Sequence, residues 1–74
     1  MPQLTSFDGI DICMYFRDHA QPHVHAFHGD NEAHVVIKDG SVYAGDLSSR
    51  KLVMVQAYVA VNVEELLARW ATYG

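Results

Sequence analysis

Residues 23–38, HVHAFHGDNEAHVVIK, decide the fold. Side chains alternate over residues 23–28, which is the period of a β-strand; one side carries His23, His25 and Phe27, and the other carries Val24, Ala26 and His28. Gly29-Asp30-Asn31 has strong turn chemistry, and residues 32–38 are rich in β-branched valine and isoleucine. The stretch therefore predicts two strands separated by a turn.

The same kind of pattern predicts one strand before residues 23–38 and one strand after them. Residues 10–17 alternate, with one apolar side formed by Ile10, Ile12, Met14 and Phe16. Asp8-Gly9 before them suits a turn. Asp39-Gly40 is typical of a two-residue hairpin turn that leads into a strand at residues 41–44. Four strands in sequential antiparallel order would make a small meander.

After Gly45 the pattern changes. Asp46, Ser48 and Ser49 are good helix caps. Residues 52–61 fit both helical spacing and strict alternation. Their valines favour a strand, but their length and the caps favour a helix, which is the interpretation we prefer. A helix here would be apolar nearly all round, and would be buried under the sheet or at a dimer contact.

The last segment predicts a second helix. Asn62 followed by Glu65 resembles a capping box, and Leu66, Leu67 and Trp70 share one helical face. The expected fold class is α+β, with a three- or four-stranded antiparallel β-meander followed by two C-terminal helices packed on the sheet. We expect residues 1–74 to form one domain.

Length and charge restrict the function. The chain has 74 residues and a formal net charge of −4, which argues against broad binding to phosphate backbones. In so small a chain hydrophobic burial and conformational entropy nearly cancel, so a metal, a protein partner or a homo-oligomer is an expected source of stability. Residues 52–61 are too short an apolar run to span a membrane. With the single cysteine Cys13 and no signal peptide, we expect a cytoplasmic protein.

The candidate site lies in residues 18–29, DHAQPHVHAFHG, which hold four of the five histidines. His23 and His25 are two residues apart on a strand, so both imidazoles project from one face, with Cα atoms about 6.6 Å apart. They could share zinc or another divalent metal, with a further ligand from His19, Asp18, His34 or Glu32. The alternative is a pair of half-exposed histidines that only bond to their neighbours.

A second chemistry needs no metal. His23 and His25 could act as acid and base in RNA cleavage. Arg17, Tyr15 and the Arg50-Lys51 pair could then stabilise the developing negative charge. Cys13 is interpreted as a packing residue, because no neighbour that would activate its thiol is identifiable.

The sequence resembles a known family of short bacterial proteins, the domain-of-unknown-function (DUF) 4160 family, marked by an FxGI opening, an MY pair and a DHxPPHFHA segment. The matching residues are Phe7, Gly9, Ile10, Met14, Tyr15, Asp18, His19, Pro22, His23, His25, Ala26 and Gly29. Gln21 replaces the family's first proline and Val24 its phenylalanine, and His28 stands where an aromatic residue such as tyrosine is common.

The resemblance implies an α+β domain with helices at its C-terminus. Members often lie beside another small domain in the manner of toxin–antitoxin pairs, which implies a component of such a module, with RNA or a neighbouring protein as its partner. Asp18, His19, His23 and His25 would then form a polar site for RNA cleavage or metal binding. The alternative is a non-enzymatic, acidic protein-binding module, an antitoxin or an inhibitor of a basic partner.

Overall fold

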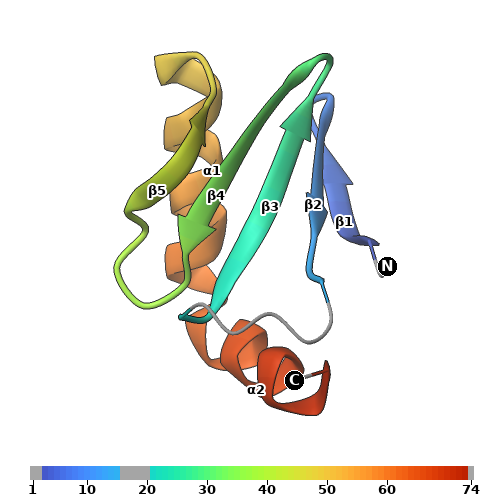
Figure 1. The fold of residues 1–74 in the computed structure, drawn as a ribbon, viewed down its shortest axis with the longest axis vertical. Helices are drawn as coiled ribbons and strands as arrows, with labels where there is room; N and C mark the ends of the chain where they lie inside the picture. The colour runs from blue at the N-terminus through green and yellow to red at the C-terminus, as the bar shows by residue number, and fades with distance from the viewer. Residues whose placement is uncertain (1–2, 16–20, 74) are drawn as a thin grey trace.

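Five strands in sequential order form one antiparallel sheet, and two helices follow it (Figure 1). The computed structural model describes residues 3–15 and 21–73. The elements are β1 (Gln3–Phe7), β2 (Ile10–Cys13), β3 (His23–His28), β4 (Asn31–Val36), β5 (Val42–Asp46), α1 (Ser49–Val61) and α2 (Val63–Tyr73). The predicted α+β meander with two C-terminal helices is confirmed, with one strand more than expected.

The additional strand is β1, which pairs with β2 across the Asp8-Gly9 turn. Both turn residues have positive φ, 53° and 79°, and Asp-Gly is a favoured pair for two-residue turns of this kind. β2 ends at Cys13, short of the predicted residues 10–17. Phe16 and Arg17 lie outside the described residues.

The predicted two-residue turn at Asp39-Gly40 is wrong. β4 ends at Val36 and β5 begins at Val42, so residues 37–41 form a longer loop, which the Val36 N–H closes by donating to the Ser41 carbonyl at 2.8 Å. The Gly40 N–H donates back to the Val36 carbonyl at 2.8 Å, so the pair that closes the loop is Val36 and Ser41 and four residues lie between them. Ile37 is fully buried, and its N–H continues the pairing with the chain before β3 by donating to the Pro22 carbonyl at 3.0 Å.

The core lies on one face of the sheet, between the strands and the helices. Its strand residues include Ile10, Ile12, Val24, Ala26, Ala33 and Val35, and its helix residues are Val55, Val59 and Leu66. Figure 1 shows α1 lying along this face and α2 crossing below one end of the sheet. Residues 52–61 are therefore helical, as their caps predicted, and Val55 and Val59 provide their buried side.

Local bonds set the helix ends. The Ser48 hydroxyl caps α1 by accepting the Lys51 N–H at 3.3 Å. Asn62 ends α1, and its side chain donates to the Tyr58 carbonyl at 2.8 Å. The predicted capping box is therefore wrong, because Asn62 is engaged by the preceding helix and Glu65 pairs with Arg69 at 3.3 Å. In the described part of the chain, neither helix is long and apolar enough to cross a membrane.

Candidate metal-binding site

Strand register gathers three histidines on the sheet face opposite α1. The turn at residues 29–30 pairs His28 with Asn31, which places His25 directly opposite His34 and Phe27 opposite Glu32. Directly paired residues of an antiparallel sheet project from the same face. His23 joins them because it lies two residues before His25 on β3.

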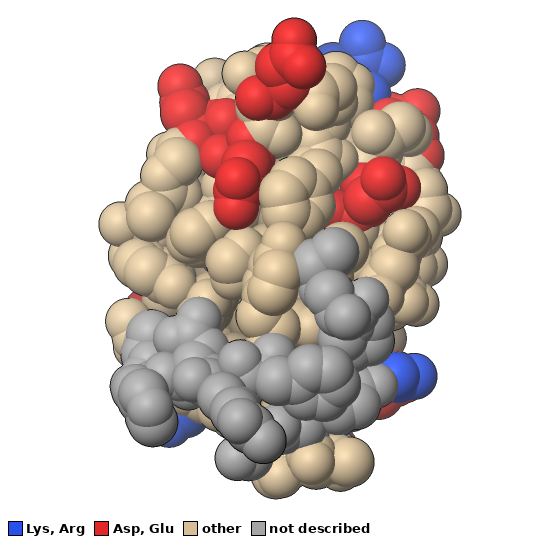
Figure 2. All heavy atoms as spheres, turned by 45° about the vertical axis from the view of Figure 1, so that its right-hand side comes forward, with Lys and Arg blue, Asp and Glu red and all other residues tan. Residues whose placement is uncertain are grey.

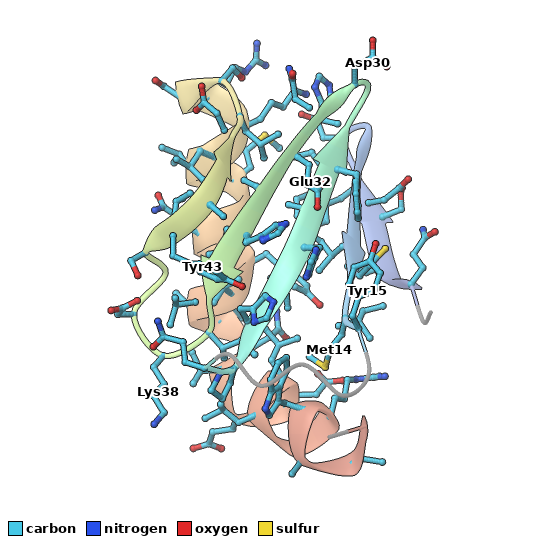
Figure 3. All side chains as sticks on the ribbon, viewed as in Figure 1. Met14, Tyr15, Asp30, Glu32, Lys38 and Tyr43 are labelled. Atoms are coloured by element: carbon cyan, nitrogen blue, oxygen red, sulfur yellow. The ribbon has the colours of Figure 1, made fainter. Side chains whose placement is uncertain are left out.

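Two tyrosines flank the histidines. Figure 3 shows Tyr43 on β5 and Tyr15 after β2 on either side of the sheet face, with Glu32 above them. The Tyr43 ring lies 5.1 Å from that of His23, and the Tyr15 ring lies 4.2 Å from that of His25. The β4–β5 register shifts at Tyr43, which lies between Ala44, opposite His34, and Val42, opposite Val35, and such bulges re-aim side chains. Burial raises the pKa of Tyr15, so its phenol stays protonated.

The acceptors beside the two Nδ1 atoms indicate which ring nitrogens carry protons. His23 Nδ1 lies 2.8 Å from the Gln21 carbonyl oxygen, and His25 Nδ1 lies 3.3 Å from Glu32 Oε2. A carbonyl and a carboxylate oxygen only accept hydrogen bonds, so both Nδ1 atoms are the protonated donors. In the neutral imidazoles the Nε2 atoms of His23 and His25 therefore carry lone pairs.

These two Nε2 atoms face one another at 3.1 Å. Two lone pairs at this distance repel unless a cation lies between or beside them, and that cation is either one additional proton or a metal ion. His23 is 1% exposed and His25 is 9% exposed. Burial is the main reason that the pKa of His25 is lowered, with the neighbouring His34 and His23 as further causes and Glu32 opposing them. The lowered pKa means that His25 holds an additional proton less tightly than a free imidazole does, and a metal ion is the other cation that could accept both lone pairs.

The spacing of the three rings fits a metal ion. One ring nitrogen from each of His23, His25 and His34 lies within 4.8 Å of the others. Zinc binds imidazole nitrogen at about 2.0–2.1 Å in tetrahedral geometry, which places two ligand nitrogens about 3.3 Å apart. The 3.1 Å between His23 and His25 is close to this value, and His34 would move slightly inward to complete the set.

Glu32 orients two of the imidazole rings by accepting hydrogen bonds from them. Its Oε2 accepts hydrogen bonds from His34 Nε2 at 2.7 Å and from His25 Nδ1 at 3.3 Å. The bond from His34 is the main reason that the pKa of Glu32 is lowered. Metal-binding histidines characteristically donate their second N–H to a carboxylate or a backbone carbonyl. Here Glu32 and the Gln21 carbonyl are such acceptors.

Acidic side chains border the site. The register places Asp11, Phe27, Glu32 and Asp46 in one row across β2 to β5, next to the row that contains His25 and His34. Figure 2 shows acidic side chains over the upper half of the visible surface, with the Lys and Arg side chains near its edges. The local field therefore attracts cations and repels polyanions.

Part of the predicted site is assembled. His23, His25 and Tyr15 come together, and His34 and Glu32, which were alternatives for the further ligand, join them. The predicted site residues Asp18, His19 and Arg17 lie outside the described residues.

The remaining predicted groups lie elsewhere. Lys51 donates to Asp8 Oδ2 at 3.0 Å, at the start of α1, so the Arg50-Lys51 pair is not part of the site. His28 lies on the opposite face near Gly9. Cys13 is buried, and burial raises the pKa of its thiol, consistent with a packing residue.

Two aromatic neighbours were not predicted as site residues. The Trp70 ring lies 5.1 Å from that of His23, and Tyr43 also contacts His34, at 5.6 Å between ring centroids. Tyr43 reaches the histidines through a bulge, and Trp70 through packing of α2 below the sheet. Neither arrangement has a local sequence signal.

Comparison with known proteins gives a family without a known function. Residues 9–71 match a family model described as "Domain of unknown function (DUF4160)", so the chain belongs to that family. Neither the curated proteins nor the solved structures contain a match.

Proposed function

We propose that this member of the DUF4160 family binds one divalent transition-metal ion, zinc or a similar ion, through His23, His25 and His34. The observation that carries the proposal is the 3.1 Å approach of two buried Nε2 atoms whose Nδ1 partners are both occupied by acceptors. An ion that accepts both lone pairs would remove the repulsion between them. Imidazole nitrogen suits zinc, copper, nickel and iron.

The described residues supply three ligands, which leaves one position of a tetrahedral ion for a further group. Three protein ligands leave room for a water molecule or a substrate group at a tetrahedral ion, as in catalytic zinc sites. Tyr43 beside the histidines is 44% exposed, so solvent can reach this side of the cluster. The proposed ion would therefore be able to activate a bound water.

Metal-free RNA cleavage is less well supported. It requires a phosphodiester to approach a row that contains Asp11, Glu32 and Asp46, against their negative charge. A toxin–antitoxin role stays a prediction from the family resemblance. Growth of bacteria after induction of the wild-type chain and of the His23→Ala variant tests that role directly.

Metal binding is tested on tag-free protein after dialysis against a chelator. We expect about one zinc ion per chain by calorimetry, and a tetrahedral visible spectrum when cobalt(II) replaces zinc. His23→Ala and His25→Ala should each weaken binding at least about 100-fold, since each removes a ligand.

The matched control is His28→Ala, which removes a histidine from the opposite face of the same strand. It should bind as the wild type does. Circular dichroism verifies that each variant folds. If wild-type binding is no tighter than that of folded His23→Ala, or if His28→Ala weakens it equally, the proposal is wrong.

A further inference from the structure

The side of α1 that faces away from the sheet carries an apolar stripe. Val53 is 62% exposed and Val61 is 83% exposed, although both are large hydrophobic residues. Ala57 and Ala60 lie between them and are also exposed. Val53, Ala57 and Val61 are spaced by four residues, so they lie along one line on the helix surface.

Charged side chains of opposite sign lie at the two ends of this stripe. Arg50 is exposed in the first turn of α1, and Glu64 is exposed in the first turn of α2. Both are seven residues from Ala57, and Val53 and Val61 are both four residues from it. Along the chain this order of basic, valine, alanine, valine and acidic residues is complementary to itself in the antiparallel direction, and Glu64 on α2 lies beside Val61, since both line one hollow.

Hollows accompany the stripe on the surface. One lies between α1 and the loop at residues 37–41, with Val53, Ala57 and Ala60 in its wall. The other lies at the corner between α1 and α2, beside Val61 and Glu64. In an antiparallel pair the second hollow would receive the other copy's N-terminal end of α1.

We propose that a second copy of this chain docks on the stripe, by antiparallel two-fold packing of α1 on α1 centred at Ala57. Each Val53 then packs against the partner's Val61, and each Arg50 pairs with the partner's Glu64. The small side chains of Ala57 and Ala60 let the two helix axes approach to about 8–10 Å. Closed two-fold symmetry uses the same patch on both copies, as this arrangement does.

The expected affinity is modest. Within α1 the stripe runs from Arg50 to Val61, about 17 Å at 1.5 Å per residue, so the interface is at the small end of the range for specific complexes. Each chain also has a net charge of −4, which opposes association. The dimer should therefore dissociate on dilution.

Analytical ultracentrifugation in the presence of a chelator tests the dimer without contribution from bound metal. We expect a monomer–dimer equilibrium for the full chain between low micromolar and near-millimolar concentration. Val61→Glu should shift it to monomer, because it places a carboxylate in the apolar contact. The control Ala68→Glu adds the same charge on an exposed position of α2 and should leave the dimer intact.

A charge reversal tests the register. Arg50→Glu should weaken association at least about tenfold, which is 1.4 kcal/mol. Arg50→Glu combined with Glu64→Arg should restore it. A monomer at every concentration, a dimer insensitive to Val61→Glu, or a double reversal that does not recover association would each overturn the proposal, once circular dichroism has shown that the variants fold.

Discussion

Replacing Glu32 with Gln should weaken zinc binding by about 10–100-fold, or about 1.4–2.8 kcal/mol. The substitution keeps the shape of the side chain but removes the negative charge. The carboxylate accepts hydrogen bonds from His34 at 2.7 Å and from His25 at 3.3 Å through a single oxygen. An amide oxygen accepts both bonds less strongly, so the two rings would be held less firmly and their free nitrogens would be poorer ligands. Competition of zinc between the protein and a chromogenic chelator at neutral pH measures the change.

The matched control is Asp11→Asn. Asp11 lies in the same cross-strand row, beyond Phe27, and the substitution removes the same charge. If Glu32 acts through its hydrogen bonds, Asp11→Asn should change affinity far less than Glu32→Gln does. Equal losses in the two variants would show that only the net charge matters, and unchanged affinity in Glu32→Gln would refute the role assigned to the carboxylate. Nitrogen-15 NMR of the metal-free protein also reports whether Nδ1 is the protonated nitrogen of His25. The proposal requires this, because Nε2 must carry the lone pair that binds the metal.

Two further predictions concern glycine backbone conformation, and two concern shifted pKa values. Gly45→Ala should destabilise folding by about 2 kcal/mol or more in urea denaturation, because φ is 78° and the added Cβ would collide with the backbone of Glu32. Gly29→Ala, with φ of 61° and no atom within 4 Å, should cost about 1–2 kcal/mol from backbone strain alone. The lowered pKa of His25 means that the folded apoprotein binds this proton less tightly than the unfolded chain, so the His25 contribution to stability should be lost as pH falls below about 6.5. The urea midpoint measured between neutral and mildly acidic pH tests this, and a contribution that grows on acidification would contradict it. The raised pKa of Cys13 predicts slow reaction with a thiol reagent at pH about 8 until denaturant is added, and rapid reaction of the folded protein would show that the thiol is accessible.

Alternation of side chains was sufficient to predict the central strand, whose bounds, His23–His28, are those expected. It was insufficient for β1, because residues 3–7 are half-exposed and have no fully buried member. Asp8-Gly9 gave the missing signal, since such a turn normally joins two strands. The loop at residues 37–41 could not be predicted locally, because its length depends on the β4–β5 register, which shifts between His34 and Val35.

The site was predictable to the extent that it depends on strand periodicity. The two-residue spacing placed His23 and His25 on one face, and the structure confirms this. His34 was one of several candidates for the further metal ligand, because the residue opposite it on the neighbouring strand depends on the strand register. Counting outward from Gly29-Asp30 as a two-residue turn would have placed His34 opposite His25. Tyr43 and Trp70 depend on a bulge and on helix packing, which sequence spacing does not specify.

The position of the histidines argues that a metal ion bound there would be functional and would not be required for folding. All three belong to β3 and β4, which already pair over six residues of each strand and whose opposite face is packed against α1. A metal ion between them would close only a short segment of chain, so its loss changes the entropy of the unfolded chain little. Apolar residues in place of His23 and His25 would fill the same buried space without the repulsion of facing lone pairs. A fold that keeps two imidazoles there lowers its own stability, which is expected of a binding site. The proposed dimer contact on α1 lies on the other side of the sheet, so a dimer would carry two such sites, both facing outward.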